Sequence, residues 1–333
     1  KEDQPESQSP AEIKQKALES IKDPELQKLF EGILERTTIE KEALQVSEEL
    51  KSQIPTDAKA AGTQMWLPVC PMPTDLCRVS PFFPMNRNDL AERPYIKQMI
   101  IMKNAWGEIQ FSGPRLSTYE EDVLMALLAL LNNADKRTET TIEGQGTYTY
   151  KGPFYPLLKL IKGPKPNKTE YRRVYEALRL LATSGFNLVV FKDGKIKKER
   201  LSNILTYAEW DHETKELKIT LNPYFYEIYM KGNFTLIEIE QRRRLTSPIA
   251  KALHRFVLSH RDNTWQGHFL TLAATLNLNI EQATKEIRRL IKLAMAQLIK
   301  ENILTKQSKF VSQDVVRLDR QIGVTERKKA LKK

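Results

Sequence analysis

The same helix start signal occurs twice in this sequence, in similar surroundings, and this repetition constrains the fold more than any other feature. Asn167 precedes a helical pattern of apolar residues, and Glu170 follows three positions later. Asn279 precedes a second such pattern, and Gln282 follows at the same spacing. A short polar side chain followed three residues later by Glu or Gln is typical of a helix N-terminus. We therefore expect two long, capped helices. Ser117 with Glu120, and Ser247 followed by Pro248, predict the starts of two further helices.

The elements expected around these helices follow one order in both halves of the chain. The first half reads helix, short strand, short helix, capped helix and β-hairpin, over residues 117–133, 147–151, 153–161, 167–183 and 188–221. The second half repeats that order over residues 247–259, 268–270, 271–276, 279–301 and 303–318. This is the order of a winged helix, in which the third helix is the one that enters a DNA groove. The sequence predicts an α+β fold with tandem winged-helix (helix-turn-helix) domains.

Composition and proline content divide the chain into five expected segments. Residues 1–62 form an acidic arm, helical or disordered, because its start has the composition of a disordered segment. Residues 63–93 form a connector that we expect to be irregular, since its prolines exclude regular helix and central strand. The remaining segments are a first winged-helix domain over 94–236, a second over 237–320 and a basic tail over 321–333.

Charge is distributed unevenly along the 333 residues. The chain holds 53 Lys and Arg and 42 Asp and Glu, and residues 1–60 contain 9 of the basic and 14 of the acidic side chains. Subtraction leaves 44 basic and 28 acidic residues in 61–333, a net charge of +16. A basic body favours a polyanionic partner, with nucleic acid first and a membrane surface second. No apolar run approaches the ~20 residues of a membrane span, which excludes a membrane-spanning protein.

The candidate DNA-binding residues lie off the apolar stripes of the capped helices and in the expected wings. Arg can bond guanine with both nitrogens, Gln can do the same with adenine, and Lys can contact phosphates. Most exposed cations do nothing specific, so a solvated helix face is the alternative, and edge-strand protection is the alternative for the wings. The candidates are Lys165, Lys168, Thr169, Arg172, Arg173, Lys195, Lys197 and Lys198 in the first domain, and Gln282, Lys285, Arg288, Arg289, Lys292 and Lys309 in the second.

Sequence signatures of catalysis and metal binding are missing. Residues 163–169 superficially resemble a phosphate-binding loop, but the second glycine is missing and two prolines remove backbone N–H donors. Cys70 and Cys77 are too few for a zinc site, and the four histidines lie far from them. We expect no enzymatic activity, cofactor or metal, and two unpaired thiols in a reducing cytoplasm.

The stretch from Arg243 to Arg261 resembles a known family. It reads RRLTSPIAKALHRFVLSHR, and it is similar to the opening of the second domain in TrfA-type plasmid replication initiators. In that family a Leu-Ser-Pro-x-Ala-Arg segment leads to a Ser-His-Arg end, and here Thr246 precedes the Ser-Pro pair. Residues 148–186 resemble the first winged helix of the same family. The resemblance covers about residues 64–320.

The resemblance implies a protein that binds direct repeats, called iterons, in double-stranded origin DNA with both winged helices. It implies help in opening an adjacent AT-rich segment and recruitment of the host sliding clamp, initiator and helicase proteins. The family carries a Gln-Leu-Ser-Leu-Phe clamp-binding peptide before the first domain. Here Gln64, Met65, Trp66 and Leu67 stand at that place, followed by Pro68 where the family has an aromatic residue.

The last expectations concern location, oligomeric state and alternative functions. The resemblance implies a bacterial, cytoplasmic protein associated with plasmid DNA, and it leaves a homodimer open. A winged-helix transcriptional repressor would use the same two helices, and the location of the bound repeats would distinguish it from an initiator. A partner-assembly protein acting through the acidic arm and the Gln64–Pro68 peptide is the alternative in which the basic surface is incidental.

Overall fold

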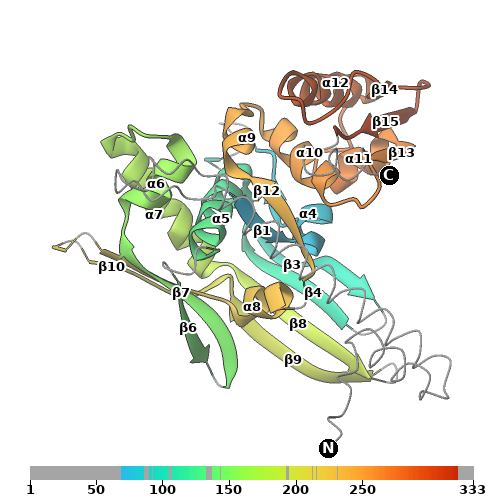
Figure 1. Ribbon diagram of the computed structural model, residues 1–333. Coiled ribbons are helices and arrows are strands. Elements are labelled where there is room, and N and C mark those ends of the chain that lie inside the picture. The colour runs from blue at the N-terminus through green and yellow to red at the C-terminus, as the bar shows by residue number, and fades with distance from the viewer. Residues whose placement is uncertain are drawn as a thin grey trace, which may run out of the picture. The chain divides into compact units, whose positions relative to one another are not determined.

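The computed structural model describes residues 69–321 except 86–89, 92, 105–106, 133–136, 143, 193–194, 212, 215 and 231. The predicted acidic arm (1–62), the peptide Gln64–Pro68 and residues 322–333 lie outside the described residues. The helices are α4 (Thr74–Arg78), α5 (Thr118–Leu131), α6 (Tyr155–Lys162), α7 (Lys168–Thr183), α8 (Pro223–Met230), α9 (Ile239–Arg244), α10 (Pro248–Leu258), α11 (Phe269–Thr275) and α12 (Thr284–Lys300) (Figure 1). The strands are β1 (Val69–Pro73), β2 (Phe82–Phe83), β3 (Tyr95–Asn104), β4 (Gly107–Pro114), β5 (Leu116–Ser117), β6 (Arg137–Ile142), β7 (Gln145–Pro153), β8 (Gly185–Lys192), β9 (Lys195–Asn203), β10 (Leu205–Trp210), β11 (Glu216–Leu221), β12 (Phe234–Glu238), β13 (Thr264–His268), β14 (Lys309–Phe310) and β15 (Val315–Asp319).

The first winged helix consists of α5, α6 and α7 with a sheet in the order β10-β11-β7-β6. The predicted start of α5 is confirmed, because Ser117 and Glu120 form a reciprocal capping box. Asn167 caps α7 by accepting a hydrogen bond from the backbone N–H of Glu170 at 3.0 Å. The Glu170 carboxylate does not close the box but lies 3.2 Å from the Lys162 ammonium. Such caps are each worth about 1 kcal/mol of helix stability.

A second sheet is inserted between α7 and the strands of the first winged helix. Strands β8 and β9 follow α7. Strand β8 pairs with β4 on one side and with β9 on the other, which gives a sheet in the order β3-β4-β8-β9. The sequence predicts one strand over residues 201–210, and this is wrong. The chain leaves the inserted sheet at Ile204, so β9 and β10 belong to different sheets, and the buried Ile204 side chain lies between them.

The second winged helix consists of α10, α11 and α12 with a sheet in the order β13-β15-β14. The predicted N-terminus of α10 is confirmed: Ser247 caps it and Pro248 occupies the first turn, where its missing N–H is not needed. The strand expected at 268–270 lies instead at 264–268, because Phe269 already begins α11. This unit has its own hydrophobic core, which includes Leu253, Leu272, Ile287, Ile291 and Leu298.

The proline-rich connector contains regular structure, contrary to the prediction from its prolines. Val69–Pro73 forms β1, which pairs antiparallel with β12, and the short helix α4 follows directly. Prolines are tolerated here because β1 belongs to a two-stranded sheet and needs hydrogen bonds on one side only. The predicted domain boundary between residues 236 and 237 falls inside β12.

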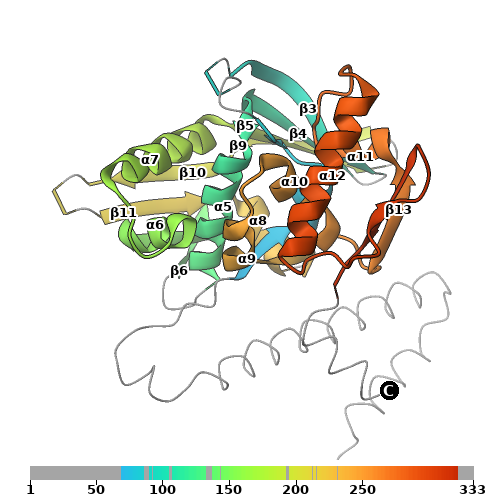
Figure 2. The same cartoon turned by 90° about the horizontal axis from the view of Figure 1, so that it is seen from above.

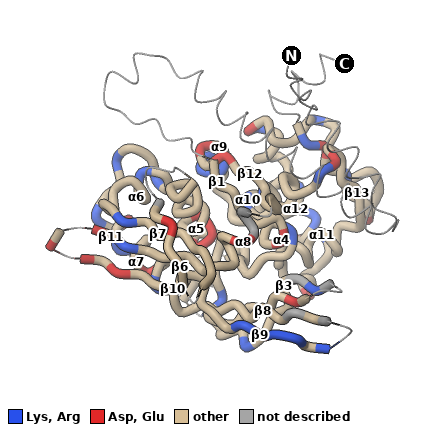
Figure 3. Tube along the Cα trace, turned by 60° about the horizontal axis from the view of Figure 1, so that its bottom comes forward, with Lys and Arg blue, Asp and Glu red and all other residues tan. Residues whose placement is uncertain are grey.

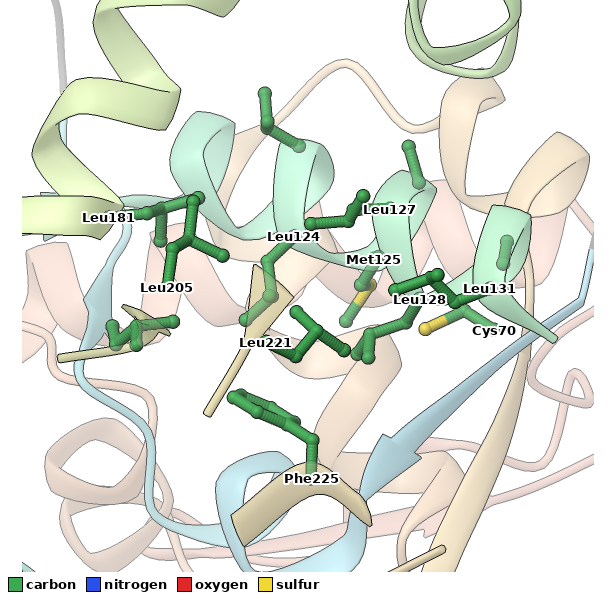
Figure 4. Close-up of a cluster of buried hydrophobic side chains, with 14 of the residues drawn as sticks. Cys70, Leu124, Met125, Leu127, Leu128, Leu131, Leu181, Leu205, Leu221 and Phe225 are labelled. Carbon is green, nitrogen blue, oxygen red and sulfur yellow. The ribbon is translucent and has the colours of Figure 1, made fainter. Parts of the chain in front are cut away.

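Helix α5 is the centre of the larger core and is buried on nearly all sides. Its side chains from Val123 to Leu131 are all at most 5% exposed, so this helix is buried around its whole circumference and not on one face alone. Figure 4 shows Leu124, Met125 and Leu128 among the side chains of this core, together with Phe225 of α8. Figure 2 shows α5 between the α6–α7 pair on one side and α10 with α12 on the other. A helix in this position can connect the two winged helices.

Candidate nucleic-acid interface

Helix α7 presents a cationic face to solvent. The predicted apolar stripe of Val174, Ala177, Leu178 and Leu181 is buried. The candidates Lys168, Thr169 and Arg172 are exposed on the opposite side, and Lys165 is exposed in the turn before the helix. Lys168, Thr169 and Arg172 lie in the N-terminal half of the third helix, the part that meets base edges in a helix-turn-helix, and Lys165 precedes it by three residues.

Arg173 differs from its neighbours because its guanidinium is already engaged. It lies 4.5 Å from the centre of the Tyr119 ring, a cation–π geometry, and 3.9 Å from the Glu170 carboxylate. Tyr119 belongs to α5, so Arg173 holds α7 against the central helix at the edge of the exposed face. Among the predicted residues of α7, Arg173 is therefore the one whose contacts are structural.

Helix α12 begins four residues later than predicted. The Asn279 side chain accepts from the backbone N–H of Glu281 at 3.0 Å, which stabilises a local turn rather than a helix end. The residue that precedes the helix is Ala283, which offers no side-chain cap. Gln282 therefore lies in a bend before α12, exposed to solvent, and not on the helix.

The candidate side chains on α12 differ in exposure and in the contacts that they make. Lys285, Arg289 and Lys292 are exposed, and Arg289 makes hydrogen bonds of 2.7 and 2.6 Å to Glu286 one turn earlier. Arg288 points elsewhere: its guanidinium is 2.8 Å from the Asp314 carboxylate and 4.5 Å from the centre of the Phe269 ring. Arg288 thus ties α12 to the β14–β15 turn and to α11.

The basic hairpin predicted as the first wing is not that wing. Lys195, Lys197 and Lys198 lie exposed on β9, at the edge of the inserted sheet, and Figure 3 shows this strand in blue. The hairpin that follows the winged-helix order is β10–β11, whose exposed described side chains from Thr206 to Lys218 include Glu209, Asp211, Glu213 and Glu216, with Lys218 as the described cation. The wing prediction was wrong because the Asp-Gly turn signal marks a hairpin without saying which sheet receives it.

The second wing agrees better with its prediction. Lys309 is exposed on β14, which pairs with β15. The Lys292 ammonium of α12 lies 5.4 Å from the centre of the Phe310 ring, next to Lys309 in the chain. The structure therefore brings Lys292 and the Lys309 segment, predicted from separate elements, to one side of the second winged helix.

A buried charge cluster joins the two winged helices, and the sequence gives no sign of it. Glu121 of α5 accepts hydrogen bonds from Arg242 of α9 at 2.7 Å and from Arg255 of α10 at 2.8 Å, and none of the three is more than 2% exposed. Asp122 accepts from Arg242 at 2.6 Å and also pairs with Lys251. Glu121 and Asp122 resemble ordinary acidic residues of a first helical turn, and their partners stand about 120 positions away, so no local signal connects them.

Charge inside this cluster is retained by mutual neutralisation. Burial alone would lower the pKa of Arg242, but the carboxylates of Glu121 and Asp122 outweigh burial and raise it. His254, also in α10 and buried, stays neutral because burial, with Arg242 and Lys251 nearby, lowers its pKa to about 3. Removing one member of such a buried pair typically costs about 3–5 kcal/mol.

In residues 69–321, outside the gaps named above, no group of three or more His, Cys, Asp or Glu side chains is arranged to hold a metal ion. Cys70 and Cys77 are unpaired, as predicted, and both are buried. Among the described helices, none is both long and apolar enough to cross a membrane.

Part of this chain is similar to a known protein family. Residues 99–257 match the family model described as "Initiator Replication protein, WH1". The match runs from β3 through α10, so it contains the whole first winged helix and the α9 linker to the second. It does not single out the TrfA type.

Two solved structures are similar to this chain, and the first of them shows a related fold. Domains 2 and 3 of RctB are 11% identical, with a TM-score of 0.54 over 75% of this chain and 99% of theirs. The Pi initiator protein in complex with iteron DNA is 14% identical, with a TM-score of 0.48 over 78% of this chain and 99% of its own. No curated protein sequence matches the chain. The tandem winged-helix fold predicted from the sequence is confirmed by the family match and the RctB likeness.

Proposed function

We propose that this initiator protein binds repeated sites in the double-stranded DNA of a plasmid origin through α7 and α12. The observation that carries the proposal is that one chain of an initiator family holds two winged helices, each with exposed cations on its third helix. Lys168 and Arg172 supply them in the first unit, and Lys285, Arg289 and Lys292 in the second. A bipartite reader of this kind suits a long repeat, because tethering makes the second contact intramolecular.

The local charges support a particular division of labour. In the second unit, Lys309 of the wing and Lys292 of α12 can approach the phosphates on either side of a groove. In the first unit, the acidic β10–β11 wing repels phosphates, so α7 and the preceding Lys165 carry the contact. The lysines of β9 belong to a different sheet and are proposed to contact DNA outside the groove that α7 occupies.

The test is selection of DNA from a random pool by the full chain, followed by footprinting on the selected sequence. We expect a recurring site protected in two successive major grooves. The affinity should fall steeply with salt, because each neutralised phosphate releases counterions. A footprint confined to one groove would remove one of the two helices from the proposal. Selected sites that map to promoters and not to an origin would favour the repressor.

We further propose that the protein opens the origin without enzymatic activity, by bending or untwisting DNA at steps where deformation costs least. Host clamp, initiator and helicase proteins are the proposed partners, and Gln64, Met65, Trp66 and Leu67 are the proposed clamp contact. A homodimer and a location on plasmid DNA in the bacterial cytoplasm belong to the same proposal. Co-purification of the full chain with each host protein, with and without origin DNA, tests these partners one at a time.

A further inference from the structure

The joint between the two winged helices contains buried charged and polar groups beside one apolar contact, in which Leu258 of α10 packs against the core of the first unit. The two units have separate hydrophobic clusters, one ending at Ile239 and the other starting at Leu245. Between them lies the cluster of Glu121, Arg242 and Arg255, with contacts of 2.7 and 2.8 Å. Buried charges favour one geometry, because a shift that separates a pair leaves a charge unpaired in the interior.

Residues 69–85, here called the strap, contribute a second set of directional bonds. The strap belongs to the core of the first unit, where Phe82 is buried and β2 pairs with β5. Its backbone faces the second unit: the Phe82 carbonyl accepts from Arg255 at 3.3 Å, and the Ser80 carbonyl accepts from the Asn277 amide at 2.7 Å. The Asn277 amide is also 3.3 Å from the Phe82 carbonyl, and Arg78 of the strap donates to the Ser259 carbonyl at 3.0 Å.

The backbone conformation of Asn277 also contributes to the geometry of this joint. It has a positive φ of 58°, a conformation that costs energy for any residue but glycine. Asn tolerates it better than most residues, and in this turn after α11 the Asn277 amide donates to the two strap carbonyls. The sole other described non-glycine residue with positive φ is Asn302, at 56°, and it lies outside the joint.

From these contacts we infer that Glu121, Arg255 and Asn277 are positioning residues that fix α7 relative to α12 and so set the spacing between the two halves of the DNA site. The inference rests on the proposed function for its DNA part, but the fixed geometry itself needs no DNA. None of the three side chains is among the cations proposed to touch DNA. Their effect is therefore on which spacing is bound, and not on how strongly one helix binds its own half.

The first experiment measures the joint without DNA. Spin labels are attached at Glu176→Cys on α7 and Ala296→Cys on α12, both exposed positions. The native thiols label slowly, because both are buried and burial raises the pKa of Cys77 to about 12. We expect one narrow distance distribution in the parent and a broad one in Asn277→Gly, which keeps the positive φ at no cost but removes the amide.

Asn302→Gly is the matched control, since it makes the same change at the other positive-φ asparagine. It should keep the narrow distribution. The double variant Glu121→Gln/Arg255→Met removes the central bond without leaving an unpaired charge on either residue, and it should broaden the distribution further. Narrow distributions in both Asn277→Gly and a folded double variant would overturn the inference. If the double variant does not fold, Asn277→Gly decides alone.

The second experiment uses the full chain and the DNA selected above, with 5 base pairs inserted between the two footprinted halves. The insertion turns one half by about half a helical turn, so the parent should lose about 30-fold or more in affinity. Asn277→Gly should lose about threefold or less, and Asn302→Gly should behave as the parent. A variant as sensitive to spacing as the parent would refute the inference. If the parent selects no DNA, the proposed function fails, and the distance measurement still decides the joint.

Discussion

Lowering the pH should destabilise this protein through His254, in a window that the structure defines. The ring is fully buried in α10, its Nε2 lies 3.2 Å from the Gln241 side-chain oxygen, and Arg242 and Lys251 are nearby. Burial, reinforced by these two cations, lowers its pKa from 6.5 to about 3. The unfolded chain therefore takes up a proton near pH 6.5, whereas the folded chain does not.

The sign and size follow from proton linkage. The neutral ring contributes its full stability above pH 6.5, and this contribution is lost as the pH falls from 6.5 toward 3. At pH 5 the unfolded chain has taken up a proton at His254 and the folded chain has not. This lowers the free energy of unfolding by about 2 kcal/mol. Carboxylates that are paired in the folded state add their own losses at lower pH, so a comparison with a variant is needed.

The assay is urea unfolding of the full chain at pH 7.5 and pH 5. His254→Gln keeps a polar side chain without a titratable ring, so the drop in its free energy of unfolding between the two pH values should be about 2 kcal/mol smaller than in the parent. Val257→Ala, a change in the same helix that removes no titratable group, should lower stability equally at both pH values. An equal pH-dependent loss in His254→Gln and in the parent would refute the reasoning.

Three other changes test the DNA and partner surfaces. Arg289→Ala should weaken the selected site more than random DNA, by about 1–3 kcal/mol of discrimination, and equal losses would assign Arg289 to the phosphate backbone. Glu213→Lys, at the tip of the acidic β10–β11 wing, should tighten binding to DNA of any sequence and steepen its salt dependence, because it replaces a charge that repels phosphates in the unit that contains α7. Unchanged binding would place this wing away from DNA. A peptide of residues 60–73 should bind purified sliding clamp weakly, and Gln64→Ala with Leu67→Ala should abolish that binding; a mutant peptide that binds as well as the parent peptide argues against a clamp contact.

Most helices and strands of this protein could be predicted from the sequence. Ser117 with Glu120, Asn167, and Ser247 with Pro248 predicted three helix starts that the structure confirms, because a cap depends on residues three positions apart. The element order predicted two winged helices. The wrong prediction for the start of α12 also has a local cause. The Asn279 side chain accepts a hydrogen bond from Glu281 in a turn, and this use of the side chain competes with capping a helix.

What the tertiary structure decided is which elements meet. In the sequence the basic β8–β9 hairpin resembles a wing, but in the structure β8 pairs with β4 of the β3–β4 hairpin. Strand pairing depends on surfaces that no single segment contains. Arg288 and Arg289 are adjacent and alike in sequence, yet only Arg288 reaches Asp314 and Phe269, because successive helix positions point about 100° apart. Glu121 and Arg255 are separated by 134 residues, and only folding makes their charges a single buried pair that joins the two winged helices.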